Sequence, residues 1–132
     1  MRLRRTIRAW GRHEGGAAAV EYAFILPMFV MLVMGVISTA QLASAINGMH
    51  FAVAEAARCW AVNATTCGST TATVTFAQSR YVGPDIHPTF LAGSADCGRT
   101  VTVTGSYTLE LAITEIAVPL SAAACYPAAN LT

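Results

Sequence analysis

Four cysteines are the side chains in this 132-residue chain best suited to forming covalent or metal bonds: Cys59, Cys67, Cys97 and Cys125. An even number of cysteines in an exported segment is typical of a disulfide framework. Three pairings are possible. We favour Cys59 with Cys67 and Cys97 with Cys125, because each pair would join neighbouring elements of the expected fold. Zinc is the alternative, but the chain has no C-x-x-C pair and its cysteine spacings are long and irregular.

The other residues that could catalyse a reaction are scattered. His13, His50 and His87 lie in a basic leader, a helix and a proline-rich loop. No Ser-His-Asp or Cys-His spacing stands out, no glycine-rich phosphate loop follows a strand, and no two acids share an obvious cleft. We therefore expect no enzyme, no cofactor and no metal site.

One carboxylate, that of Glu21, stands at the start of a long apolar run. No charged residue lies between Tyr22 and Ile46, and these 25 residues include eleven strong membrane formers. At about 1.5 Å a residue, the run is long enough for the roughly 30 Å hydrocarbon core. Its insertion is favourable by about 3 to 7 kcal/mol, against about 3 kcal/mol for one carboxylate at the bilayer centre. The run is therefore predicted to be a membrane helix.

The net charge of +1 is distributed unevenly along the chain. Residues 1–14 carry +4, from five arginines and one glutamate, and residues 15–132 carry −3, from three arginines and six acids. Positive charge stays on the cytoplasmic side of an inserting helix, so the N-terminus is predicted to be cytoplasmic and the C-terminal part periplasmic or extracellular. Nucleic acid could attract five arginines too, but a basic flank beside an apolar helix is typical of a topology signal.

Small residues, Gly15 to Ala19, precede the apolar run. A secretory signal peptide has the reverse order, with small residues after a shorter apolar stretch. Any cleavage would therefore fall on the cytoplasmic side and leave the helix in the product. A glycine before the cut would let a protease hold the backbone closely in an extended form.

The segment Gly16-Ala17-Ala18-Ala19-Val20-Glu21-Tyr22 matches the Gly-x-x-x-x-Glu-Tyr processing pattern of the tight-adherence (Flp) branch of type IV pilins and pseudopilins. With Leu26-Pro27, Ala56-Ala57-Arg58 and the stretch 120–127, the chain resembles the TadE-like pilus assembly proteins. Only the N-terminal third of this resemblance is specific.

The resemblance implies that a membrane-embedded prepilin peptidase cuts between Gly16 and Ala17. It also implies that Glu21, next to Tyr22 of the pattern, pairs with the new α-amino group of a neighbouring subunit and sets the register of assembly. A carboxylate near a helix N-terminus is favoured by the helix dipole. The alternative is an interfacial glutamate that merely reaches water.

The helix is predicted to continue past the membrane to about Ala61, with a kink near Pro27, which removes one backbone hydrogen bond. Its second half is amphipathic. An apolar stripe recurs at steps of three and four residues and should pack against the C-terminal part: Leu42, Ala45, Met49, Val53, Ala56 and Trp60. Phe51 falls on the polar side of the helix.

The C-terminal part is predicted to hold a loop over 63–71, a short helix over 70–82 and two antiparallel strands, over 100–111 and 116–125. The pattern over 70–82 is also compatible with a strand, and the family resemblance favours the helix. Pro119 suggests an edge position for the second strand. The sheet would cover the apolar stripe of the helix.

We therefore predict an α+β fold in which a long N-terminal transmembrane and amphipathic helix, as in pilins, packs on a small antiparallel β-sheet head. Residues 1–16 would be a basic cytoplasmic leader, 17–46 the transmembrane half of the helix, 47–62 its amphipathic extension, and 63–132 the exported head.

The predicted function is that of a minor pilin or pseudopilin-like structural subunit of a tight-adherence type IV pilus system, in the inner membrane with a single pass. Its partners would be other pilin-like subunits, pilus assembly platform proteins and the prepilin peptidase. The alternative is a signal-anchored exported enzyme or binding protein of unknown substrate. The sequence leaves open whether the helix stays in the bilayer or enters the filament.

Overall fold

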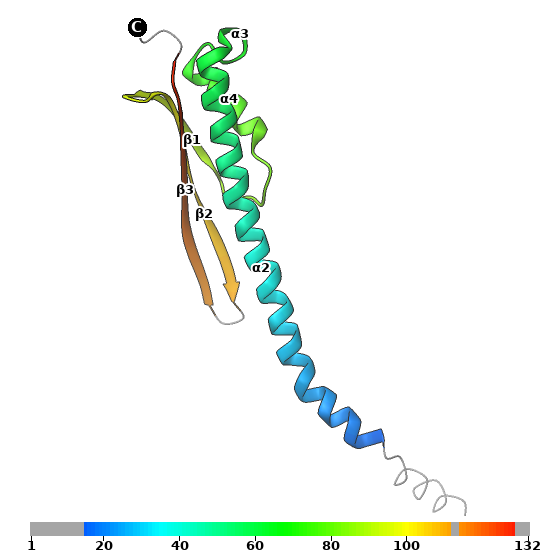
Figure 1. Cartoon of the computed structure of the whole chain (residues 1–132). Helices are drawn as coiled ribbons and strands as arrows, with labels where there is room; N and C mark the ends of the chain where they lie inside the picture. The colour runs from blue at the N-terminus through cyan, green and yellow to red at the C-terminus, as the bar shows by residue number, and fades with distance from the viewer. Residues whose placement is uncertain (1–14, 112–113, 129–132) are drawn as a thin grey trace, which may run out of the picture. The chain divides into compact units, whose positions relative to one another are not determined.

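A computed structural model describes residues 15–111 and 114–128 of the chain (Figure 1). Its helices are α2 (Gly15–Val62), α3 (Ala64–Cys67) and α4 (Thr70–Arg80), and its strands are β1 (Thr89–Ala95), β2 (Gly98–Leu111) and β3 (Thr114–Tyr126). This order confirms the predicted α+β fold. The boundary between two compact units falls within α2, between Ile37 and Ser38. The second unit, Ser38–Thr132, is called the head from here on, so the name now includes the later turns of α2 as well as residues 63–132.

The helix α2 is continuous from Gly15 to Val62 and contains Pro27. It confirms the helix predicted to run from residue 17 to about residue 61. Alanine, leucine and methionine, which lose little side-chain freedom in a helix, recur throughout. The kink at Pro27 stays a prediction.

The core of the head lies between α2 and the sheet. From α2 it takes residues at helical steps, and the sheet supplies the facing layer, as predicted. The buried residues are Ala45, Met49, Ala52, Val53, Ala56 and Ala57 from α2, Ala77 from α4, Ile86 from the linker before the sheet, and Phe90, Val101, Val103 and Ala122 from the strands.

The sheet has the order β1-β2-β3, and both pairs of neighbours are antiparallel. Residues of β2 and β3 alternate between the core and solvent, so that Val101 and Val103 are fully buried. Both predicted strands are confirmed, as is the edge position of Pro119, because β3 pairs only with β2. In the register of that pair, Pro119 lies opposite Ser106.

Two elements differ from the prediction. The first is β1, which was not predicted from the sequence. It forms a hairpin with β2 through Asp96 and Cys97, where Gly98 adopts φ = 126°, a backbone conformation that favours glycine. The second is α3, so the prediction of a loop over the whole of 63–71 is wrong. Asn63 caps this single turn, its Oδ1 accepting from the Thr66 amide at 3.1 Å.

The helix α4 confirms the short helix predicted over 70–82. Ser69 is its N-cap, and its Oγ accepts from the Ala72 amide at 3.1 Å. Thr73 and Ala77 are both fully buried and lie four residues apart, so burial follows helical rather than strand periodicity here.

Two disulfides connect the elements of the head. Cys59–Cys67 joins the last turns of α2 to α3, and Cys97–Cys125 joins the β1–β2 turn to β3. This is the connectivity that the sequence favoured. In so small a domain such links typically stabilise the fold by about 2 to 4 kcal/mol each.

Candidate functional site

The structure places Gly16, Ala17, Glu21 and Tyr22 in the first two turns of α2. Glu21 is exposed and makes no hydrogen bond or ion pair with any residue in 15–111 or 114–128. The side chain of Tyr22 is 72% exposed. Within these residues the Glu21 carboxylate is therefore available to a cation from another chain.

The peptide bond between Gly16 and Ala17 lies in helical backbone. A peptidase that holds this bond in an extended form would first have to unwind the turn. Two factors keep the cost small. The first four amides of a helix have no intrahelical acceptor, and glycine is less favourable in a helix than alanine by roughly 0.5 to 1 kcal/mol. No described atom lies within 4 Å of where a Gly16 Cβ would be, so the backbone is open to close approach.

An exposed apolar surface surrounds α2 from Val20 to Ile37. Phe24 and Met28 are each 75% exposed, and all the large apolar side chains of this segment lie on the surface. A helix that is apolar on all sides belongs in a membrane or in the core of a large protein. Among the described residues, α2 is the one helix long and apolar enough to cross a bilayer. The first unit thus fits a membrane anchor.

The head has an apolar groove on the face of α2 that does not meet the sheet. It encloses about 640 Å³ and is lined by Ala40, Ala43, Ser44, Asn47, Gly48, Phe51 and Val82. Gly48 allows the backbone of Val82 to approach, since a Cβ there would overlap the Val82 carbonyl oxygen. Phe51, predicted on the polar side, is 55% exposed at this groove.

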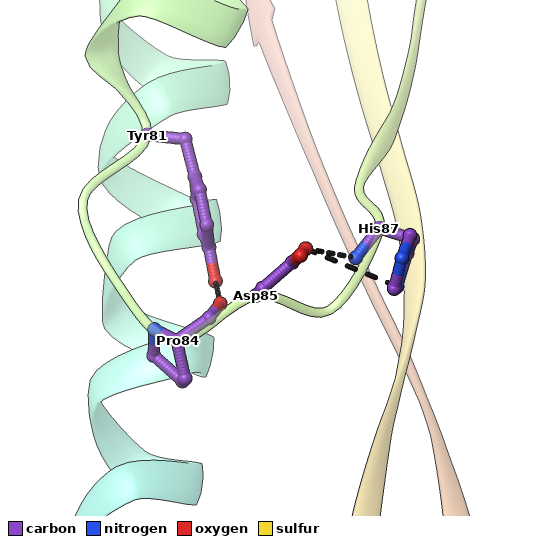
Figure 2. Close-up of polar contacts among 4 residues, drawn as sticks. All are labelled: Tyr81, Pro84, Asp85 and His87. Carbon is purple, nitrogen blue, oxygen red and sulfur yellow. Dashed lines mark hydrogen bonds and ion pairs between the residues drawn. The ribbon is translucent and has the colours of Figure 1, made fainter.

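The linker from α4 to β1 is held by local polar contacts, drawn in Figure 2. The Tyr81 hydroxyl donates to the Pro84 carbonyl oxygen at 2.7 Å. Asp85 Oδ1 accepts from the His87 amide at 3.0 Å and lies 3.8 Å from His87 Nδ1. Both side chains are largely exposed, so the contact between them contributes little to stability. These contacts shape the loop and position the buried Ile86.

Burial raises the pKa of the Tyr81 hydroxyl, and the negative charge of Asp85 raises it further. Both effects oppose the tyrosinate and leave the hydroxyl as a donor to Pro84. Tyr81 therefore acts as a structural hydrogen-bond donor.

The described residues contain no buried polar cluster of the kind that catalysis uses. Thr73 is the one fully buried polar residue among them, and its hydroxyl donates to the Ser69 carbonyl at 2.8 Å. Over 15–111 and 114–128 no group of three or more histidine, cysteine and acidic residues could hold a metal ion. His50 and His87 are exposed on separate elements, and His13 lies outside the described residues.

Two contacts that hold the sheet to α2 have no signal in the sequence. Tyr107 of β2 donates to Gln41 Oε1 at 2.8 Å, and the Arg99 guanidinium lies 4.6 Å from the Trp60 ring centre. Each contact joins residues far apart in the chain. It could be predicted only if the position of β2 along α2 were already known.

In the comparison with protein families, the model described as TadE-like protein matches residues 16–58. The match confirms the resemblance stated from the sequence. It spans the residues predicted for processing, the exposed apolar surface and most of the α2 face in the core. The head from Cys59 onward lies outside it. The chain has no significant similarity to a curated protein or to a solved structure.

Proposed function

We propose that this chain is a minor pilin or pseudopilin-like structural subunit that takes part in assembling a tight-adherence pilus. The observation that carries the proposal is the TadE-like match over 16–58, which coincides with the exposed apolar surface of α2. A family model, a processing pattern and a membrane-competent helix therefore fall on one segment.

In this proposal α2 anchors the subunit in the inner membrane, with residues 1–16 as a cytoplasmic leader and residues 63–132 exported. The charge difference between the two sides of the helix supports this orientation. The two disulfides support it as well, because disulfides persist in the periplasm and outside the cell but are rare in the cytosol.

Processing would supply the cation that Glu21 lacks. A cut after Gly16 creates an α-amino group on Ala17, and the same group of a neighbouring subunit would pair with the exposed Glu21 carboxylate. In the low dielectric of a membrane such a charge-assisted contact is strong, and it fixes the axial position of one helix against the next.

The head favours a minor or accessory role over that of the major filament subunit. Major pilins of the Flp branch, which the sequence resembles, consist of little more than the helix. Here a three-stranded sheet with two disulfides follows it. Its surface would contact other pilus components.

Crosslinking in the native membrane tests the proposal. The full-length chain should co-purify with pilins and pilus platform proteins after crosslinking, and intact-mass analysis should find a product of 116 residues, 17–132. Recovery of the chain without any pilus component would contradict the assembly role. An uncut chain that still co-purifies would remove only the processing and register steps.

A further inference from the structure

The two disulfides of the head differ in how far they are shielded from solvent. In Cys59–Cys67, Cys67 is fully buried and Cys59 is half-buried. In Cys97–Cys125, both residues are exposed. Exchange with a thiol requires a thiolate to reach one of the two sulfur atoms of the disulfide. Solvent exposure therefore favours exchange at Cys97–Cys125 over exchange at Cys59–Cys67.

The position of Cys125 on the sheet leaves its sulfur open to attack. Along β3, Ala122 and Ala124 pack against the core, whereas Ala123 and Cys125 are exposed, so Cys125 belongs to the face of the sheet turned away from α2. β3 is also an edge strand that pairs only with β2. A thiolate attacks a sulfur from the side opposite the S–S bond. At Cys125 this side lies towards the free edge of β3, because the bond runs towards the β1–β2 turn.

A polar contact favours Cys97 as the sulfur that leaves. Its Sγ lies 3.7 Å from the hydroxyl oxygen of Thr100. A disulfide sulfur carries no hydrogen, so the Thr100 hydroxyl is the donor in this contact. The same hydroxyl can donate to the Cys97 thiolate as the S–S bond breaks, and a better stabilised thiolate leaves faster. The nearest charged residues in the sequence, Asp96 and Arg99, are opposite in sign, so their effects on this thiolate oppose each other.

We propose that Cys97–Cys125 is a site of thiol–disulfide exchange with a dithiol, whereas Cys59–Cys67 is a structural link. A thiolate of the dithiol attacks Cys125 Sγ, the S–S bond breaks, and Cys97 leaves as a thiolate that takes a proton from solvent. The mixed disulfide on Cys125 is then attacked by the second thiolate of the same dithiol. Cys125 leaves and is protonated in turn, and the dithiol closes its own disulfide. The protein thereby gains the two electrons that the dithiol loses.

Exchange at this site would loosen one end of the sheet and leave the rest in place. The bond ties the β1–β2 turn to the C-terminal end of β3. Without it, the end of β3 is held by its pairing with β2 alone, and such strand ends open at low cost. Cys59–Cys67 would still join α2 to α3. The inference goes beyond the proposed function and does not depend on the pilus role, because it concerns the head alone.

Limited reduction tests which disulfide opens first. Full-length protein in detergent is incubated with dithiothreitol, a dithiol, and samples are quenched with acid, alkylated and mapped by mass spectrometry. Alkyl groups should appear on Cys97 and Cys125 at a rate at least about tenfold higher than on Cys59 and Cys67. Equal rates, or faster labelling of Cys59 and Cys67, would overturn the proposal.

Hydrogen exchange of the partly reduced protein tests whether the opening is local. Amides at the end of β3, over 124–126, should lose protection, while the buried face of α2 keeps it. Loss of protection throughout the head would show that the bond holds the whole fold, and unchanged protection at 124–126 would show that it holds nothing. Either result contradicts a local opening.

A monothiol tests the order of the steps, because it stops at the mixed disulfide. After brief exposure to glutathione, the glutathione should be found on Cys125 and the alkyl group on Cys97. Thr100→Val removes the donor with little change in shape and should slow this step by about two- to fivefold. The matched control is Thr104→Val, an exposed position on the same face of β2, which should leave the rate unchanged. Glutathione mainly on Cys97, or an unchanged rate in Thr100→Val, would reject the assignment of Cys97 as the leaving sulfur.

Discussion

The Tyr107 hydroxyl donates to Gln41 Oε1 across 66 residues of sequence, which joins the middle of β2 to α2. Since both side chains are partly exposed, water competes for the contact, and its net value should be at the lower end of the range for a neutral hydrogen bond. Tyr107→Phe should therefore lower the free energy of unfolding by about 0.5 to 1 kcal/mol. Denaturation of full-length protein in detergent measures this. A double-mutant cycle with Gln41→Leu is the control: if the two losses add fully, the residues do not interact.

Gly48 lies where α2 and the linker touch. A methyl group there would overlap the Val82 carbonyl oxygen and press on the Tyr81 ring. Gly48→Ala should therefore destabilise the head by about 1 to 3 kcal/mol, although alanine is the better helix former. The matched control is Gly93→Ala in β1, where no described atom lies within 4 Å of the added carbon. A Gly48→Ala protein with an unchanged or higher melting temperature would show that the linker does not pack on α2 as described.

The two disulfides close loops of different length, with sequence separations of 8 and 28. If loop entropy dominates, opening the longer loop costs about 1 kcal/mol more. Replacing both Cys97 and Cys125 by serine should thus lower stability more than the same change at Cys59 and Cys67. Chemical denaturation of the two double variants compares them. Equal losses would indicate that local packing, rather than loop closure, sets their contribution.

Tyr81 should make the head sensitive to alkali. Its pKa is raised in the folded protein by burial and by Asp85, so the folded state holds this proton more tightly than the unfolded chain does. Its contribution to stability is complete below the ordinary tyrosine pKa near 10 and is lost as pH rises through the higher folded value. Ionisation also removes the donor to Pro84. Tyr81→Phe should flatten the fall in melting temperature above pH 10, and an unchanged slope would show that Tyr81 does not set it.

Glu21 offers a direct test of the register step. Glu21→Gln keeps the shape of the side chain and removes its charge, so membrane insertion should persist and become slightly easier. Crosslinked complexes with pilus components should fall at least tenfold in yield. Glu21→Asp should retain part of the yield, because it keeps the charge on a shorter side chain. Full assembly of Glu21→Gln would leave Glu21 as an interfacial residue that only contacts water.

The elements with strong periodicity could be predicted from the sequence. The apolar run and the stripe from Ala45 to Ala56 specify α2 and its buried face, and alternation over 100–111 specifies β2. The cysteine pairing could also be predicted, because each of the two pairs joins elements that are neighbours in the predicted fold.

The elements that were not predicted from the sequence have no such periodicity. β1 has seven residues, and only Phe90 is buried while Ala92 is partly so, which leaves too few apolar positions to show alternation. α3 is a single turn defined by the Asn63 cap and the Cys59–Cys67 link. The cleft lined by Arg58 of α2 and Arg80 of α4 brings together residues whose proximity depends on the packing of three helices. Tertiary contacts, rather than local preference, determine all three.

Pro119 lies on the edge strand of a sheet in a protein that we expect to be crowded among its own copies. Proline has no amide hydrogen to offer to an incoming strand, so it interrupts the row of donors along which sheets of neighbouring molecules would fuse. Heads held together through side chains can separate again, whereas heads merged into one continuous sheet would become an amyloid-like deposit. In the proposed assembly, this missing amide hydrogen would help to keep contacts along the β3 edge reversible.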